Sequence, residues 1–413
     1  YSLWALVETA VSPSQPQDPA FFRDCLKQGQ AYIQQLFNQG TDITELVQQR
    51  AYFVDQVLAQ LWSQHIPDDS PMSLLSVGGY GRGELHPYSD IDLLILLKNT
   101  VSETPPESLS QFLTELWDIG LEIGHSVRTI NECRQLAEQD ITIATNLLET
   151  RLLAGEDSLF LALQQLTVTY KTWDEKQFFQ NKLAEQKQRH LKYNDTANNL
   201  EPNLKESPGG LRDLHVISWI AQQHFSVSNI QGLHEKGFIA TNEYEILERA
   251  QHFLWRVRFV LHMLADRKQE KLMIDYQREI AIKLGYQDDE NRLAVEHFMK
   301  AYYLCARRVE QMNELLVQLF EENIILAEQP RNITTINRRF QIHNGYLETI
   351  NSGIFAFRPY AMLELFLILQ QNPDIKGVRA DTIRQIHAHL HLIDDAFRAD
   401  IKSRSLFMEI IRQ

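Results

Sequence analysis

Cysteine is scarce in this 413-residue sequence, which contains only Cys25, Cys133 and Cys305. The three residues lie far apart and lack the spacing of a metal-binding motif, so they argue against a disulfide framework or a cysteine-based metal site. This usage is typical of reduced thiols, and we expect a cytoplasmic protein.

Positive charge is also in short supply, because 40 Lys and Arg residues face 54 Asp and Glu residues and the formal net charge is −14. Proteins that bind nucleic acid usually carry a basic surface for the phosphates. We therefore expect no nucleic-acid partner, whereas a free nucleotide or a protein substrate is compatible with this charge.

Long hydrophobic runs are missing as well. The most apolar late segment, residues 355–370, is interrupted by Arg358 and Glu364, and the first residues lack the basic start and apolar core of a secretory signal. We expect no membrane partner. The chain also begins without Met and stops without a closing feature, so we expect it to be a segment of a longer protein.

The most informative stretch that the sequence does contain lies between residues 74 and 97. Residues 74–77 are apolar or small and lead into Gly78-Gly79, which predicts a strand followed by a tight turn. Residues 91–97 are apolar apart from Asp92, which predicts a buried strand. A turn without side chains leaves its backbone N–H groups accessible, as a phosphate site requires.

Two acidic residues, Asp90 and Asp92, lie at the start of the second of these strands. Side chains repeat every two residues along a strand, so the two carboxylates point the same way. Like charges on one face need a counter-charge, and a divalent metal ion is the usual one. The pattern indicates metal-assisted chemistry on a nucleoside triphosphate; the alternative is a structural turn with a salt-bridged Asp pair.

The order of a Gly-Gly pair, a gap and Asp-x-Asp on a strand resembles the polymerase-β-like nucleotidyltransferase superfamily. The full string GGYGRGELHPYSDIDLLIL, residues 78–96, is more specific. It resembles the nucleotidyltransferase domain of the bifunctional uridylyltransferase/uridylyl-removing enzymes, which modify the PII nitrogen-signalling protein. Other phosphate motifs fit poorly, because no Gly-Lys-Ser/Thr ending is present and the glycine spacing is wrong for a dinucleotide fingerprint.

A third strand is predicted within residues 118–129, which alternate in part. Members of the superfamily often carry a third carboxylate in an apolar-acid-apolar setting, and Glu122 is the nearest match. Asp118 is the competing candidate. An ordinary solvent-side Glu on an edge strand explains Glu122 equally well.

A second informative string, residues 201–215, contains a Pro-Gly-Gly turn and then opens a helix. Lys205 and Arg212 near that helix start suit an anion. The string resembles the helical domain that follows the nucleotidyltransferase domain in uridylyltransferases, and its core also resembles glutamine synthetase adenylyltransferases. By this resemblance it lies against the active-site cleft. The alternative is that Arg212 and Asp213 pair to fix the domain junction.

The resemblance covers nearly the whole chain and is weakest over about the first 60 residues. It implies an α+β fold: a polymerase-β-like nucleotidyltransferase domain with a small mixed sheet, followed by a mostly α-helical bundle domain. The expected segments are an N-terminal helical region, the nucleotidyltransferase domain, a helical domain of the uridylyltransferase type, and a helical segment leading to an absent HD domain: 1–65, 66–155, 156–330 and 331–413.

The resemblance implies the transfer of UMP from UTP to a tyrosine of PII with release of pyrophosphate. Asp90 and Asp92 would hold one or two Mg²⁺ or Mn²⁺ ions, and Glu122 would complete the metal site or act as base. The implied nucleotide-binding residues are Gly78, Gly79, Arg82, Ser89, Lys205 and Arg212.

The sequence contains no His-Asp dipeptide, the mark of the family's hydrolytic domain, so we expect no uridylyl-removing activity. The alternatives are an adenylyltransferase acting on another protein and a catalytically dead nucleotide-binding regulatory module.

Overall fold

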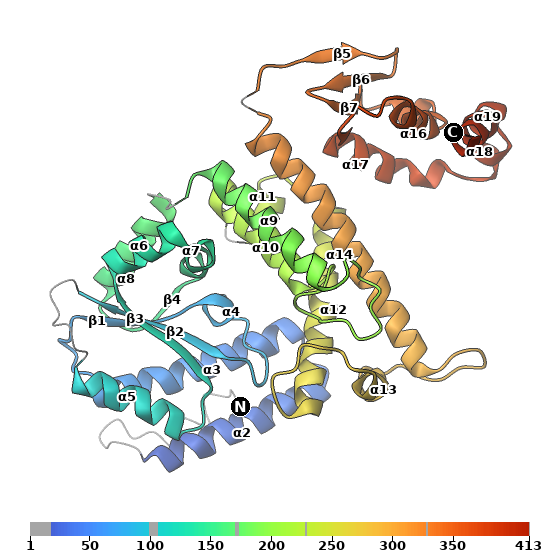
Figure 1. Ribbon diagram of the computed structural model, residues 1–413. Helices are drawn as coiled ribbons and strands as arrows, with labels where there is room; N and C mark the ends of the chain where they lie inside the picture. Colours follow the sequence, from blue (N-terminus) through green and yellow to red (C-terminus); the bar gives the residue numbers. More distant parts are fainter. Residues whose placement is uncertain (1–17, 99–105, 170–172, 228, 328, 413) are drawn as a thin grey trace. The chain divides into compact units, whose positions relative to one another are not determined.

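The computed structural model describes residues 18–98, 106–169, 173–227, 229–327 and 329–412 (Figure 1). The chain divides into two compact units, one up to Glu310 and one from Gln311 onward. This single boundary differs from the four segments expected from the sequence, which remain a proposal.

Two helices open the described part of the chain, α2 (Pro19–Asn38) and α3 (Ile43–His65). Each begins at an aspartate whose carboxylate accepts hydrogen bonds from the first turn: Asp18 from the Ala20 N–H and Asp42 from the Thr44 N–H, both at 2.9 Å. The second helix turns an apolar stripe to the interior, and the members of the stripe are all buried: Leu46, Phe53, Val54, Val57, Leu58 and Leu61.

A four-stranded mixed sheet forms the centre of the first unit, in the order β3-β2-β1-β4. β2 is antiparallel to β1 and parallel to β3, and β4 is antiparallel to β1. The three predicted strands are confirmed, with the bounds β1 (Met72–Ser76), β2 (Ile91–Leu97) and β3 (Ile123–Thr129). The sequence analysis predicted no strand at β4 (Arg151–Gly155). The nucleotidyltransferase-type mixed sheet expected from the sequence is therefore present.

Helices on both faces of the sheet bury its apolar side chains (Figure 1). Leu75, Leu94 and Leu96 pack on the face that is covered by α6, α7 and α8, together with a short π-helical turn. On the other side α3 contacts α5 and β4, and the Trp62 and Phe112 rings meet edge to face. The bounds are α5 (Glu107–Asp118), α6 (Ile130–Gln139), α7 (Ile141–Leu148), α8 (Asp157–Gln164) and the turn Gln165–Thr169.

Asp92 belongs to the same row of side chains as Leu94 and Leu96, because residues two apart on a strand share a face. The leucines lie beneath the helices, whereas Asp92 stands at the open end of the row and is exposed. The sequence predicted a carboxylate inside a buried strand. The structure instead places the Asp92 carboxylate at the exposed end of the strand, so the free-energy cost of desolvating its charge is smaller.

The remainder of the first unit is helical, in agreement with the α-helical bundle domain that the resemblance implied. Its helices pack as a bundle beside the sheet (Figure 1). The bounds are α9 (Glu175–Lys192), α10 (Leu211–Phe225), α11 (Ile230–Glu235), α12 (Thr241–Ala265), α13 (Ile274–Lys283) and α14 (Ala294–Ile324), which continues into the second unit.

The second unit contains a small sheet that the sequence analysis missed, since only a helical segment was predicted over 331–413. Its order is β5-β6-β7-β8, and the residues Asn344 and Gly345, both with positive φ, turn β6 into β7. An Asn-Gly pair is a strong hairpin signal, but strands of two to four residues show too little alternation to predict. The strand bounds are β5 (Ile333–Thr335), β6 (Phe340–His343), β7 (Tyr346–Thr349) and β8 (Gly377–Val378).

Five helices and a 3₁₀ turn complete the described residues of the second unit. Phe340, Leu347 and Phe355 form the centre of its core. The bounds are α15 (Ile354–Phe357), α16 (Ala361–Gln371), α17 (Ala380–His389), the turn Leu390–Leu392, α18 (Asp395–Ala399) and α19 (Ile401–Arg412).

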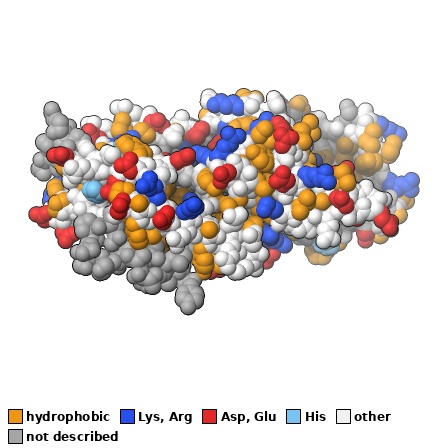
Figure 2. All heavy atoms as spheres, turned by 90° about the horizontal axis from the view of Figure 1, so that it is seen from below, with side chains coloured by type: hydrophobic (Ala, Val, Ile, Leu, Met, Phe, Trp, Pro, Cys, Tyr) orange, Lys and Arg blue, Asp and Glu red, His pale blue; other side chains and the backbone are white. Residues whose placement is uncertain are grey.

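Surface charge is mixed on the face shown in Figure 2, where Lys and Arg side chains are interspersed with Asp and Glu. Within the described ranges, no helix combines the length and the apolar character that a membrane crossing requires.

Candidate functional site

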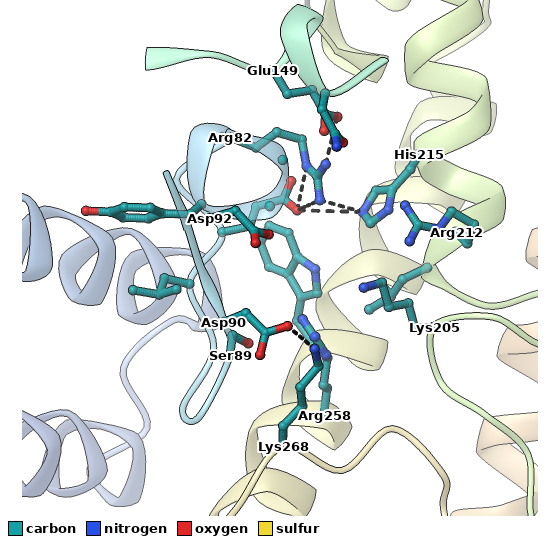
Figure 3. Close-up of a pocket in the computed structure, with 18 residues that line it drawn as sticks. Arg82, Ser89, Asp90, Asp92, Glu149, Lys205, Arg212, His215, Arg258 and Lys268 are labelled. Atoms are coloured by element: carbon teal, nitrogen blue, oxygen red, sulfur yellow. Dashed lines mark hydrogen bonds and ion pairs between the residues drawn. The ribbon is translucent and has the colours of Figure 1, made fainter. Parts of the chain in front are cut away.

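A pocket between the sheet and the helical bundle collects eight of the nine site residues predicted from the sequence (Figure 3). These eight are Gly78, Gly79, Arg82, Ser89, Asp90, Asp92, Lys205 and Arg212. Glu122 is the exception. The two strings that stood out in the sequence, more than one hundred residues apart, therefore meet at one place.

The short helix α4 (Gly78–Gly81) forms one wall of the pocket and needs glycine for steric reasons. Gly78 has a φ of 60°, which glycine adopts without strain. A Cβ on Gly81 would lie 1.8 Å from the Glu149 carbonyl oxygen, so the turn could not pack against the end of α7 with any side chain there. The N–H groups of Gly78 and Gly79 have no intrahelical partner, because they lie in the first turn.

Asp90 and Asp92 both face into the pocket, as alternation predicted (Figure 3). The Asp90 carboxylate pairs with the ammonium group of Lys268, whereas the Asp92 carboxylate has no hydrogen bond or ion pair among the described residues. Partial desolvation by the pocket walls, although the side chain reaches solvent, and the neighbouring Asp90 charge raise the pKa of Asp92. The proximity of the two carboxylates is therefore costly without a cation.

Gly124 makes room for the Asp92 carboxylate. It is the register partner of Asp92 on the parallel strand β3, and a Cβ there would lie 2.6 Å from Asp92 Oδ1. Sequence reasoning gave Gly124 no role, because the contact depends on strand pairing.

The third carboxylate remains a prediction. Glu122 precedes β3, and its backbone carbonyl accepts a hydrogen bond from the Ile91 N–H at 3.0 Å. Strand alternation gives it the same sheet face as Gly124, but its side chain is exposed and does not line the pocket. Asp118, the competing candidate, is exposed at the end of α5 and is also absent from the lining.

Basic side chains from the helical bundle line the wall opposite the two aspartates: Lys205, Arg212, Arg258 and Lys268 (Figure 3). The Lys205 ammonium has no hydrogen bond or ion pair within the described residues. Burial, together with the charges of Arg212 and Arg258, lowers the pKa of Lys205 to about 8. A half-buried cation with no protein partner is suited to an anionic ligand.

Two loops of the bundle are cross-linked and so bring these cations together. The Leu204 N–H donates to the Glu270 carbonyl and the Leu272 N–H to the Pro202 carbonyl, both at 2.8 Å. The Asn203 side chain shapes the first loop by accepting from the backbone N–H groups of Lys205 and Glu206. Lys205 and Lys268 are therefore placed by the same pair of loops.

Two of the basic side chains, Arg258 and Arg212, pair with acidic residues from the bundle side of the pocket. The Arg258 guanidinium binds Glu270 and, although burial opposes the shift, lowers the pKa of that carboxyl to about 2. Arg212 binds Glu206 at 3.0 Å and lies over the Trp219 ring. Both guanidinium groups are thus held in fixed positions at the pocket wall.

The predicted alternative for Arg212, a pair with Asp213, does not occur. Asp213 is fully buried and instead accepts hydrogen bonds from Arg189, His190 and Gln186. Although burial opposes the shift, the hydrogen bond from His190 and the Arg189 charge lower the pKa of Asp213. Adjacent residues on a helix point in different directions, so Arg212 lines the pocket while Asp213 is buried inside the bundle.

Arg82 belongs to a buried layer at one end of the pocket. Its guanidinium binds Glu84 at 2.9 Å and Glu149 at 2.7 Å, and it donates to His215 Nε2 at 3.2 Å. Although burial opposes the shift, the two carboxylates raise the pKa of Arg82. Burial and the Arg82 charge hold the pKa of His215 well below its usual range, so this imidazole is neutral.

The Ser89 hydroxyl is buried at the pocket wall without a hydrogen-bond partner in the described part of the chain. An unpaired buried hydroxyl is costly, so Ser89 is suited to contact a ligand. No cluster of three or more His, Cys, Asp or Glu side chains in the described ranges could hold a metal ion.

A two-carboxylate arrangement nevertheless fits Mg²⁺, which is usually bound through one or two protein carboxylates, water and substrate phosphates. Asp92 has both oxygens free for such an ion, and Ser89 adds an unpaired oxygen nearby in sequence. The residues present therefore fit a divalent ion that arrives with a nucleotide.

Sequence reasoning missed Lys268, Arg258, Glu149 and His215. Arg258 lay in a string that resembled the family's helical domain, but nothing distinguished it from a solvated Arg. Lys268 follows a helix end and carries no local signal.

Comparison with known proteins gives three family-model matches. The models are described as nucleotidyltransferase domain, over residues 68–192, GlnD PII-uridylyltransferase, over 177–317, and uridylyltransferase GlnD third domain, over 340–413. The first two matches overlap over residues 177–192, and together the three matches cover most of the chain from residue 68 onward.

Individual relatives agree with these matches. A protein named bifunctional uridylyltransferase/uridylyl-removing enzyme from Pseudomonas syringae pv. tomato is 48% identical over 394 residues. Proteins of the same name from Pseudomonas fluorescens and Pseudomonas aeruginosa are 47% identical over the same length. The alignments cover 95% of this chain and 44% of each relative, so the chain spans less than half the length of the curated relatives it matches.

Proposed function

Because this chain belongs to the family of bifunctional uridylyltransferase/uridylyl-removing enzymes, we propose that it transfers UMP from UTP to a tyrosine of the PII protein. The observation that carries this proposal is the pocket itself, in which two aspartates face a wall of four basic side chains. That combination suits a metal-bound triphosphate, which presents a divalent cation to the acids and phosphate oxygens to the bases.

The reaction forms a bond between the tyrosine oxygen and the α-phosphorus and breaks the bond from that phosphorus to the bridging oxygen. Pyrophosphate leaves, and the hydroxyl proton passes to a base or to water. A tyrosine hydroxyl has a pKa of about 10, so about one in a thousand is ionised at pH 7. The site must therefore both remove a proton and disperse negative charge.

Asp90 and Asp92 would hold Mg²⁺ or Mn²⁺, which when bound neutralises phosphate charge and orients the triphosphate. Lys205, Arg212 and Arg258 would bind phosphate oxygens from the opposite wall. The backbone of Gly78 and Gly79 allows a close approach of the phosphates without a side chain in the way.

Arg82 is better suited to support the site than to bind the nucleotide, because it is paired with two carboxylates, Glu84 and Glu149. Arg212 and Arg258 each pair with one carboxylate. The direct contact of Arg82 with phosphate remains a prediction, as does the role of Glu122 as third metal ligand or base.

Mass spectrometry provides the direct test. The chain is incubated with PII, Mg²⁺ and each nucleoside triphosphate in turn, and the products are searched for a nucleotide on a tyrosine. We expect one UMP per modified site with UTP only. An AMP adduct would instead support an adenylyltransferase, and metal-dependent nucleotide binding without pyrophosphate release would support a regulatory module with no catalytic activity.

A second measurement concerns the reverse activity. The family's hydrolytic domain is marked by a His-Asp dipeptide, which does not occur in this sequence. We expect that uridylylated PII incubated with this chain releases no UMP beyond the rate of a sample without protein. Steady release would show that these residues contain a hydrolytic site of another kind.

A further inference from the structure

The cation nearest to the aspartate pair is Lys268, whose ammonium group binds Asp90 Oδ2. It comes from the helical bundle rather than from the sheet that carries the aspartates (Figure 3). Asp92 has no such partner among the described residues. One of the two carboxylates therefore already has a counter-ion supplied by the protein.

The conformation at the end of α12 determines where Lys268 lies. Asp266 ends the helix in the left-handed conformation, with a φ of 51°, and so redirects the chain toward residues 87–90. Two further contacts fix this approach: the Tyr88 hydroxyl donates to Asp266, and His262 Nδ1 bonds the Pro87 carbonyl oxygen. Lys268 is thus brought to Asp90 by a defined junction.

The ion pair itself is easy to break. The Lys268 side chain is 37% exposed and that of Asp90 is 42% exposed, and pairs at such positions contribute little stability. The lysine side chain is long and flexible, so its ammonium group can move while the junction at Asp266 and His262 stays in place.

A divalent cation and the Lys268 ammonium both require the Asp90 carboxylate. Lys268 lines the same pocket as Lys205 and Arg258, so its displaced ammonium would stay within reach of the proposed phosphate site.

We propose that Lys268 is an exchangeable cation, which neutralises Asp90 until a divalent metal ion takes that carboxylate and then binds the nucleotide phosphates. This rests on the nucleotide site under the proposed function but not on the acceptor protein. In this arrangement the aspartate pair is never left without a counter-ion, and metal binding is coupled to the arrival of phosphate.

The test measures metal and nucleotide binding separately. Binding of Mn²⁺ alone is followed by electron paramagnetic resonance, and binding of α,β-methylene UTP, which cannot be cleaved at the α-phosphorus, is followed by calorimetry at saturating Mn²⁺. The variants are Lys268→Met, Lys268→Arg, and the matched control Lys271→Met. Lys271 lies on the same segment, but its ammonium binds Glu201 at 2.6 Å.

We expect Lys268→Met to bind Mn²⁺ about two- to fivefold more tightly than the unmodified chain, in keeping with the weakness of an exposed ion pair. The same variant should bind the nucleotide more weakly. Lys268→Arg keeps a cation at Asp90 and should bind Mn²⁺ no more tightly than the unmodified chain, and Lys271→Met should change neither affinity by more than about twofold.

Three results would overturn the inference: unchanged or weaker Mn²⁺ binding by Lys268→Met, equal tightening in Lys271→Met, or unchanged nucleotide affinity in Lys268→Met. A thermal melt of each variant shows whether the fold is retained. If PII is not modified while these affinities change as expected, the proposed acceptor is wrong and the exchange of Lys268 still holds.

Discussion

Replacing Gly124 by alanine tests whether the position of the Asp92 carboxylate controls catalysis. The new methyl group would lie 2.6 Å from Asp92 Oδ1, about 0.8 Å short of the 3.4 Å at which ordinary van der Waals contact begins. The φ of Gly124 is not in the left-handed region, so the backbone accepts alanine. The carboxylate must therefore move while the strand stays in place.

The expected loss follows from the size of that displacement. A misplacement of about 1 Å in a reacting group can cost about a hundredfold in rate, so we expect kcat for uridylylation to fall about 30- to 100-fold. Stability should change by less than about 1 kcal/mol, because alanine is more favourable than glycine within a strand and offsets part of the strain.

The assay is steady-state uridylylation of PII, with Mn²⁺ binding as a second readout of the carboxylates. Ser126→Ala is the matched control, because Ser126 lies on the same face of β3 two residues further on and pairs with Leu94. A Gly124→Ala protein with kcat within about threefold of the Ser126→Ala protein would refute the reasoning.

Three further predictions concern single side chains. Asp92→Asn should retain the fold, as judged by a thermal melt, and should abolish transfer, as judged by pyrophosphate release. Near-normal pyrophosphate release would show that Asp92 is not a metal ligand. The pKa of Lys205 is about 8, so this side chain should lose its charge as the pH rises through that value. The affinity for α,β-methylene UTP should therefore fall about tenfold between pH 7 and 9, and the Lys205→Met variant should show no such pH dependence. Asp213→Asn should lower the free energy of unfolding by about 3–5 kcal/mol at pH 7, because Arg189 loses its buried carboxylate and keeps only the Glu206 carboxylate at 3.9 Å. Since the folded-state pKa of Asp213 lies below 3.8, this difference in urea unfolding should shrink as the pH falls below that value; a constant difference would contradict it.

Much of the part of the pocket that the sheet contributes could be predicted from the sequence, because its sequence signals are local. The Gly78-Gly79 turn, the strand that follows and the shared direction of Asp90 and Asp92 all depend on periodicity within about twenty residues. The structure confirms this geometry. That the two aspartates bind a metal ion remains a proposal, since the ion is inferred from the charge and shape of the pocket.

The other half of the site depends on contacts between distant parts of the chain. Lys268 reaches Asp90 only because a helix ends in a left-handed residue and two loops are hydrogen-bonded together. Gly124 is required only because β3 pairs with β2 in one register. Neither fact has a signature in the surrounding residues, and composition alone would describe Lys268 as a solvated surface charge.

The cross-linked loops that carry Lys205 and Lys268 have a consequence for any attempt to define a minimal enzyme. A fragment that stops after β4, at Gly155, would keep both acids of the pocket and none of the four bases that face them. Such a fragment would also lose α8, which covers one face of the sheet, and it would lack the basic wall that faces the two acids. The acids of this pocket come from the sheet and the facing bases come from the helical bundle, so the proposed nucleotide site requires both parts of the first unit.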